Sequence, residues 1–509
     1  MKQSLTVMMM VLTAMAVGGA ANAAEAQSGQ AAAGYADAPP KHWHEVDTDW
    51  MKTFKKPTEY LEMGLDIRLR EVYARNIFSL NDDYGGAENW NNYHWQRYRT
   101  RWSTKWLLDE DITFNTRLTW EFWGHCAPDH SFNSFFSEKN YDFDEAIFDT
   151  MNIQFRNAFD MPLTITAGRQ DIILGTGWLV LDGTPADGSR TIFFDALRTT
   201  YQFSDATKLD AIYIQQYDDE GKWLKPFNHG DVDDRRHVTQ KQDEIGAIMY
   251  LTHKMSDMTS IDGYYMFKKD EQSDWAKYWF RKTGAGSYRP GADQETHVLG
   301  SRLYGNLDKN WSYSAEGAYQ FGKYHPFNGD YDDHRAFGAN TKLQYSFLND
   351  LKNEVHVGYE YLSGDDPDTR KNEKFNTMWG DWPQSQRGGD LQSYMWTAEG
   401  ALGEVANLHR FGVGHSFKPH QDWTLATDWN LFWADENTFG GTAQGPGGML
   451  NFSDSSKFRG HMLTGLATYR CCKNFVTYFL VDYFLPGSYY ASPSDDNALF
   501  ARISMEWTF

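Results

Sequence analysis

The 509-residue chain has only three cysteines, Cys126, Cys471 and Cys472. A secreted protein held together by disulfides normally has a larger and even number of them, so this fold does not depend on a disulfide framework. The strand pattern described below predicts Cys126 in a long loop and the adjacent pair in a short turn at the opposite end of the fold, too far apart to form a bridge. No His or Cys lies near the pair at ligand spacing, and we predict no metal site there.

Long hydrophobic runs are also missing. Beyond residue 23, no stretch approaches the ~18 apolar residues that a membrane-spanning helix needs. The one apolar stretch, residues 5–17, follows a lysine and precedes a small-residue Ala-Asn-Ala site, which is the layout of a secretory signal peptide. We therefore predict three segments: a signal peptide at 1–23, a flexible periplasmic leader at 24–55, and a single domain at 56–509.

The chain has no surplus of positive charge. Its formal net charge is -21 at pH 7, whereas binding to nucleic acid requires a basic surface, so we predict no nucleic-acid partner. The sequence also lacks a Gly-rich phosphate loop, a zinc motif and a nucleophile elbow. We predict no cofactor, no catalytic residue and no resident metal.

What the chain does contain is a two-residue alternation of apolar and polar residues that recurs from residue 61 to the end. Alternation at this period predicts strands with one apolar and one polar face. Because the chain is hydrophilic on average yet 16% aromatic, the apolar faces are expected to contact lipid while the polar faces enclose water. The final strand shows the pattern best, with its apolar residues at Leu499, Ala501, Ile503, Met505, Trp507 and Phe509.

The connections between strands carry independent information. Short polar turns such as 108–111, 204–206 and 472–474 follow the even-numbered strands, and longer loops rich in Asp and Gly follow the odd-numbered ones. Outer-membrane barrels have short periplasmic turns and long extracellular loops. We predict an all-β protein of the bacterial outer membrane, a transmembrane antiparallel β-barrel of about 18 strands. The expected strands span residues 61–70, 94–108, 112–123, 146–156, 162–168, 194–203, 207–217, 243–252, 260–268, 296–305, 311–322, 335–347, 354–362, 407–417, 423–434, 459–470, 475–484 and 499–509.

The second expected strand has cations on one face only. Arg97, Arg99, Arg101 and Lys105 alternate with a face that includes Trp102. An arginine on the lipid face would cost roughly 2–4 kcal/mol at the bilayer midplane, so the cationic face is expected to point into the lumen. With the neighbouring strands, the predicted lumen residues that bind substrate are Arg68, Arg70, Arg97, Arg99, Arg101, Lys105, Arg117, Glu121, Arg169 and Arg198.

These lumen cations have two interpretations. They could select anions, because guanidinium groups bind carboxylates with paired hydrogen bonds and attract polyanions into a wide aqueous channel. They could instead pair with lumen carboxylates such as Asp66 and Glu121 and reinforce the wall. For the run Arg97, Arg99 and Arg101 the first interpretation is favoured, because neither neighbouring strand carries a matching acidic triplet.

Arg169 breaks the alternation of its strand. It shares parity with Leu163, Ile165 and Ala167, which would direct it toward lipid. We predict that either a bulge at Gly168 or the end of the strand turns the side chain inward.

Several segments resemble the alginate-export family of outer-membrane proteins, an eighteen-stranded barrel family. Each is short, but together and in order they are specific, and the resemblance covers most of the chain after the leader. The segments are Ala167–Gln170, Asp182–Pro185, Gly188–Thr191, Phe193–Ala196, Gly358–Asp365, Phe375–Pro383, Leu485–Ser488 and the final strand closing on Phe509.

The resemblance implies a passive exporter of an anionic polysaccharide such as alginate, with an arginine-rich lumen and periplasmic biosynthesis or export partners. The chain departs from the family pattern at Met462-Leu463-Thr464, where Glu-Leu-Asp is usual. We expect a monomer in contact with outer-membrane lipid that conducts an anionic polysaccharide or oligosaccharide. The first alternative is a general anion- or oligosaccharide-selective porin for uptake. The second is a secreted all-β carbohydrate-active enzyme with Glu316 and Glu360 as acid and base.

Two further groups of residues leave alternatives open. The acidic groups could hold Ca²⁺ or be solvated loop acids, and the second interpretation is favoured. The tryptophans could stack sugar rings at the extracellular mouth or fold an external loop. The acidic groups are Asp330, Asp332, Asp333 and His334, and Asp365, Asp366 and Asp368; the tryptophans are Trp379, Trp382 and Trp396.

Overall fold

The computed structural model is described here for most of the chain after residue 48. The residues that it describes are 49–77, 79–83, 92–127, 141–181, 193–217, 227–228, 243–272, 291–327, 329–330, 332–380, 406–438 and 450–509. The sequence motifs at 182–185 and 188–191, as well as Trp382 and Trp396, lie outside these residues.

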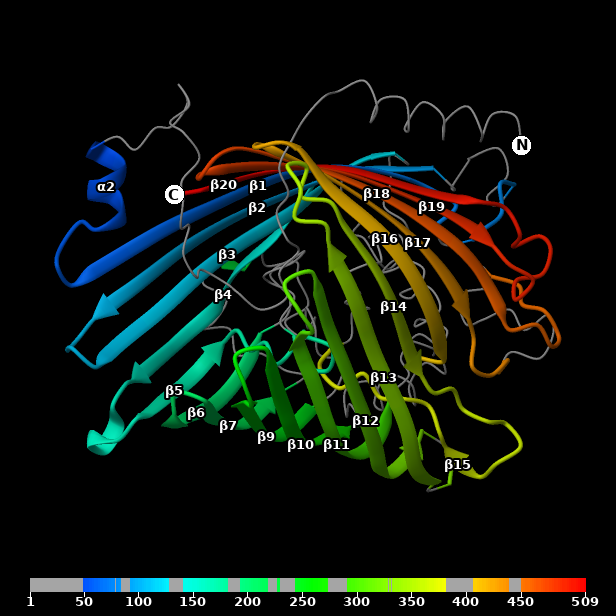
Figure 1. Cartoon of the computed structure of the whole chain (residues 1–509), viewed down its shortest axis with the longest axis horizontal. Coiled ribbons are helices and arrows are strands. Elements are labelled where there is room, and N and C mark those ends of the chain that lie inside the picture. Colours follow the sequence, from blue (N-terminus) through cyan, green and yellow to red (C-terminus); the bar gives the residue numbers. More distant parts are fainter. Residues whose placement is uncertain are drawn as a thin grey trace.

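The described residues form one closed antiparallel barrel (Figure 1). Strand β1 pairs with β2 on one side and with β20 on the other, which closes the sheet. Eighteen strands make the wall, and two further strands have two residues each, β8 (Phe227–Asn228) and β15 (Lys371–Asn372). The wall strands are β1 (Leu61–Arg75), β2 (Asn92–Leu107), β3 (Ile112–Ala127), β4 (Tyr141–Phe155), β5 (Leu163–Gln170), β6 (Phe194–Ser204), β7 (Thr207–Gln216), β9 (Asp243–Lys254), β10 (Thr259–Glu271), β11 (Ala292–Asn306), β12 (Trp311–Pro326), β13 (Asp332–Ser346), β14 (Glu354–Leu362), β16 (Leu408–His420), β17 (Trp423–Trp433), β18 (Phe458–Cys472), β19 (Phe475–Pro486) and β20 (Ala498–Thr508).

Each predicted strand is present, which confirms the fold class. Several strands extend further at the long-loop end than expected; β4, for example, begins at Tyr141 instead of residue 146. The added residues of β4 include acidic ones, which an apolar–polar pattern does not assign to a strand. Cys126 accordingly lies within β3 and not in a loop.

The two faces of the wall differ in polarity in the sense expected for a membrane barrel. On β2, the Trp102 side chain on the outer face is 47% exposed, whereas Arg101 beside it on the inner face is 8% exposed. The pattern repeats on other strands, where Leu299 and Phe337 are exposed while Thr296 and His334 are buried. The apolar side chains therefore face outward and the polar side chains face inward, the reverse of a soluble barrel.

The connections alternate in length largely as predicted. Turns such as 205–206 and 473–474 are tight, and the Asp308 carboxylate closes the turn after β11 by accepting the backbone N–H groups of Asn310 at 2.7 Å and Trp311 at 2.8 Å. These bonds lower the pKa of Asp308. One pair of connections departs from the rule, because 327–331 at the long-loop end is shorter than the turn 347–353.

The leader is not entirely irregular. Residues Asp49–Lys55 form helix α2, which lies beside β1 at the short-turn end of the barrel and buries Met51 (Figure 1). The predicted leader at 24–55 therefore includes a helix at its end, and residues 24–48 lie outside the described part of the chain. None of the helices in the described residues is long and apolar enough to cross a membrane.

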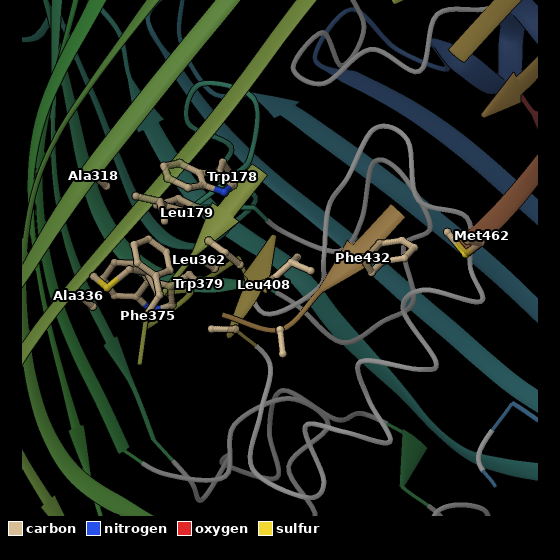
Figure 2. Close-up of a cluster of buried hydrophobic side chains, with 14 of the residues drawn as sticks. Trp178, Leu179, Ala318, Ala336, Leu362, Phe375, Trp379, Leu408, Phe432 and Met462 are labelled. Carbon is tan, nitrogen blue, oxygen red and sulfur yellow. The ribbon is translucent and has the colours of Figure 1, made fainter. Parts of the chain in front are cut away.

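Two loop segments fold into the barrel and create a hydrophobic cluster there (Figure 2). Residues 171–181 follow β5 and residues 363–380 follow β14, and the two segments join through the bonds from Trp379 N to Leu179 O at 3.0 Å and from Leu181 N to Trp379 O at 3.4 Å. The aromatic rings of these segments pack against glycines of the wall. A Cβ at Gly246 would collide with the Trp379 ring, and a Cβ at Gly338 would collide with the Phe375 ring.

Candidate functional site in the barrel interior

A cluster of arginines occupies the inner face of β1 and β2. Arg68, Arg70, Arg97, Arg99 and Arg101 are each between 1% and 8% exposed. The strand register places Arg68 directly opposite Arg99 and Arg70 directly opposite Arg97. The five predicted positions therefore form one contiguous group, which we call the arginine cluster.

Three carboxylates lie among these guanidinium groups. Glu121 on β3 pairs with Arg97 at 2.6 Å and lies 3.7 Å from Arg68. Asp66 on β1 pairs with Arg99 at 2.7 Å. The third is Asp149 on β4, which lies 3.9 Å from the Arg101 Nε. These carboxylates come from three different strands, which is why no single neighbouring strand carries an acidic triplet that matches Arg97, Arg99 and Arg101.

Asp149 reaches the interior through a β-bulge. Alternation on β4 would place it on the outer face, but the pairing of β3 and β4 shifts so that Arg117 opposes Thr150 while Leu118 opposes Phe148. The extra residue turns its carboxylate inward. There the carboxylate accepts bonds from Arg117 Nε at 2.6 Å and from the Thr119 hydroxyl at 2.7 Å. The visible signal in the sequence is an acid at position 149, where the parity of Ile147, Met151 and Ile153 predicts an apolar residue.

Arg169 lies in the interior as well. It is 3% exposed and forms two bonds of 2.9 Å to the Asp195 carboxylate, with its guanidinium 3.6 Å from the centre of the Phe193 ring. The pairing of β5 runs without a register shift past Gly168, whose φ of 117° is in a region that favours glycine. A glycine conformation next to the end of the strand thus reverses the parity, in place of the bulge that we considered.

The remaining predicted residues lie toward the short-turn end. Arg117 bridges Asp149 and Asp171, Arg198 pairs with Asp210 at 2.9 Å, and Lys105 pairs with Glu62 at 3.0 Å. All ten predicted residues thus belong to one side of the barrel, β1 to β6. The partners that the sequence analysis missed are Glu62, Asp149, Asp171, Asp195 and Asp210.

A second polar group, also missed, lies on the opposite wall beneath the loop at 171–181. Tyr250 donates to Asp262 at 2.7 Å, Asp262 pairs with Arg302 at 2.7 Å, and Tyr264 donates to Glu316 at 2.9 Å. The rings of Tyr250 and Tyr264 stack at 5.4 Å. A Cβ at Gly175 would lie 2.8 Å from the Tyr250 hydroxyl, so the loop passes directly over this group.

The second inner loop segment is held by a buried lysine. The Lys268 ammonium lies 3.1 Å from both Glu244 and Asp270 and donates to the Met378 carbonyl at 2.9 Å. The Trp379 indole N–H donates to Glu244 at 3.0 Å. Trp379 is 5% exposed, so it folds this segment inside the barrel.

The carboxylates proposed for a hydrolytic alternative have structural contacts. Glu316 accepts from Tyr264, and Glu360 pairs with Arg410 at 2.6 Å and accepts from the Trp178 indole at 3.0 Å.

The acidic residues contact their own neighbouring segments. Asp332, Asp333 and His334 lie in β13 and not in a loop, so the interpretation as solvated loop acids is wrong for them. Asp333 pairs with Lys323 at 2.5 Å, and Asp365 accepts the Glu373 backbone N–H at 2.9 Å. Across the described ranges, no group of three or more His, Cys, Asp or Glu side chains could hold a metal ion.

Comparisons with known proteins agree with the geometry. The family profile for alginate export matches residues 59–460. The chain is similar in fold to the crystal structure of Acinetobacter baumannii OccAB2, with a TM-score of 0.51 and 9% identity over 88% of this chain and 98% of that one. It is also similar to A. baumannii OccAB4, with a TM-score of 0.50 and 11% identity over 89% of this chain and all (100%) of that one. No curated protein sequence matches it.

Proposed function

This chain belongs to the alginate export family of outer-membrane β-barrel channels, and from that premise we propose that it conducts an anionic polysaccharide through an arginine-lined lumen. The family consists of channels and not of enzymes, so the carbohydrate-active enzyme considered from the sequence is wrong. The proposal concerns the charge of the cargo and the residues that meet it.

The observation that carries the proposal is the direct opposition of arginines on β1 and β2. Arg68 faces Arg99 and Arg70 faces Arg97 across neighbouring strands. Like charges directly opposite each other destabilise a sheet, so a wall built only for stability would place a carboxylate at one member of each pair. An arrangement that is unfavourable for the empty barrel becomes favourable when an anion enters between the guanidinium groups.

The carboxylates among the arginines favour the passage of an anionic polymer over its tight binding. Asp66, Glu121 and Asp149 each accept from or lie near a guanidinium group, so an incoming uronate exchanges one carboxylate partner for another. Such an exchange keeps each contact weak in net terms. Conduction requires binding that permits both arrival and departure, and a polymer that makes many weak contacts can therefore slide.

The same ion pairs favour the runner-up, a general anion- or oligosaccharide-selective porin. If the ion pairs of Arg97 with Glu121 at 2.6 Å and of Arg99 with Asp66 at 2.7 Å persist during transport, the arginines stiffen the wall. The channel then selects its substrates by their size. The two candidates differ in whether uronate oligomers compete for the guanidinium groups.

Planar-bilayer recording of the purified full-length chain separates the candidates. We expect an anion-selective current that oligouronates block, and we expect Arg97→Ser/Arg99→Ser/Arg101→Ser to weaken or reverse the anion preference and to abolish the block. The matched control removes three exposed lysines at the short-turn end, Lys254→Ser at the end of β9 and Lys309→Ser/Lys352→Ser in turns, and should leave both properties unchanged. Unchanged selectivity in the arginine variant would identify those residues as wall reinforcement and favour the general porin.

Several parts of the proposal rest on the sequence. These are the secretory signal at 1–23, a monomeric state, and periplasmic biosynthesis or export partners that deliver the polymer. The departure at 462–464 bears on which polymer is carried. Met462 is 1% exposed, and the Thr464 hydroxyl donates to Asp482 at 2.5 Å, so a neighbouring strand supplies a carboxylate next to this position.

A further inference from the structure

A cavity of about 540 Å³ lies inside the barrel at its short-turn end, next to the arginine cluster. Its volume is in the range of small-molecule sites, roughly 300–1,000 Å³. The walls come from β1 to β6 and consist largely of hydroxyl and amide side chains, among them Ser103, Asn115, Asn152, Gln154, Thr164 and Thr166.

The charged side chains that line the cavity are each paired. Each lining cation has a carboxylate within 3.0 Å, and each lining carboxylate has a cation equally near, so the cavity has little net charge. In this it differs from the neighbouring arginine cluster, where cations oppose cations. The pairs are Lys105 with Glu62 at 3.0 Å, Arg117 with Asp171 at 2.6 Å and Arg198 with Asp210 at 2.9 Å.

The hydroxyl and amide groups only partly satisfy one another. Asn115 donates to Asn152 at 3.0 Å, and Gln154 donates to Thr166 at 3.3 Å. Within the part of the chain that the structure describes, the Thr164 hydroxyl has no hydrogen-bond partner and Thr150 Oγ1 is buried without one. A wall with spare donors and acceptors and paired charges suits an uncharged ligand that carries many hydroxyl groups.

We propose that this cavity is a docking subsite that binds sugar hydroxyl groups, independently of the charge of the sugar, before the chain reaches the arginine cluster. The order follows from β2, whose inner face reads Lys105, Ser103 and then Arg101 from the short-turn end inward. Short turns of outer-membrane barrels face the periplasm, so the subsite is the first that an exported glycan meets. The inference rests on the proposed function in taking a glycan as the ligand.

The two sites should respond differently to salt. Attraction between charges falls as ionic strength rises, with a screening length of about 10 Å at 0.1 M salt and about 3 Å at 1 M. Binding through neutral hydrogen bonds lacks this dependence. We expect the uncharged trisaccharide mannotriose, added on the short-turn side of the bilayer, to interrupt the current with a dissociation constant that changes less than about twofold over this range.

Two isosteric substitutions test the residues. Thr150→Val/Thr164→Val removes hydroxyl groups that have no partner within the described chain, so the barrel should fold as before. Loss of two ligand hydrogen bonds should weaken mannotriose about tenfold or more. Thr424→Val is the matched control, because it also removes a buried hydroxyl without a partner among the described residues, on β17 outside the cavity.

The outcomes separate this inference from the proposed function. Block by mannotriose that the double variant weakens and the control does not supports the subsite, even if oligouronates fail to block and the proposed cargo is wrong. Block by oligouronates with no effect of mannotriose at either salt concentration overturns the subsite and leaves the proposed function intact. Equal weakening by the double variant and the control also overturns it.

Discussion

At the scale of single residues, two charged side chains reach the interior because their strands are irregular, whereas the arginines of β1 and β2 reach it by regular alternation. Asp149 turns inward at a bulge, and Arg169 turns inward after a glycine with positive φ. Both would face lipid in regular strands, where a charged side chain is costly. Each then gains buried partners, Asp149 from Arg117 and Thr119 and Arg169 from Asp195. A charge at an apolar position of a barrel strand therefore marks a local change of backbone geometry.

Asp149→Asn tests how much the Asp149 carboxylate contributes to the stability of the barrel. The change keeps the shape but leaves Arg117 and Arg101 with one buried counter-charge fewer. Breaking a buried ion pair by removing one partner costs roughly 3–5 kcal/mol, and we expect a loss near the lower figure because the amide still accepts from Thr119. Urea titration followed by heat-modifiable gel mobility measures it.

The control for this variant is Asp257→Asn, which alters an exposed ion pair between this short-turn carboxylate and Lys254 at the end of β9. It should leave the urea midpoint unchanged, since exposed ion pairs contribute little. A midpoint for Asp149→Asn equal to that of the control would mean that the bulge does not depend on its carboxylate.

At the scale of elements, the interior is shaped by loop segments packed onto the wall. Residues 171–181 and 363–380 hydrogen bond to one another and rest on strands that have glycine beneath the aromatic rings. Lys268 joins the wall to the second segment through the Met378 carbonyl. The width of the channel at this level therefore depends on whether this packing persists.

Lys268→Met tests that attachment. The variant removes a charge-assisted hydrogen bond to the segment and leaves Glu244 and Asp270 beside each other without the shared cation. Such a bond contributes roughly 1.5–3 kcal/mol, so hydrogen exchange in 375–380 should accelerate about tenfold or more, with a rise in single-channel conductance. Lys269→Met, one residue along and half-exposed in a pair with Glu271, is the control.

A second variant approaches the same segment from the wall. Gly246→Leu places a side chain where the Trp379 ring lies and should produce the same two changes. If exchange and conductance stay at their original values in both variants, the segment is held by contacts other than these.

At the scale of the whole molecule, the alternation and the turn lengths predicted the barrel, its strands and the inward cations, because period and connection length are local properties of the sequence. The partners of those cations were not predictable in the same way. Asp149, Asp171 and Asp195 lie on other strands or in a loop, and two of the relevant positions have reversed parity. The inner loop segments were not predicted either, because a tryptophan such as Trp379 within the long connection between β14 and β16 fits an external loop equally well from sequence.

The orientation of the barrel is the last property to test, because the docking subsite and the direction of export both depend on it. In a background with Cys126→Ser, Cys471→Ser and Cys472→Ser, single cysteines are introduced as Asp330→Cys in a long-loop-end connection and Lys309→Cys in a short turn, both exposed positions. Because short turns of outer-membrane barrels face the periplasm, a membrane-impermeant maleimide should label the first variant in intact cells and the second only after the outer membrane is disrupted. Labelling in the reverse order would place the cavity at the cell surface, where it would meet external sugars first and favour uptake over export.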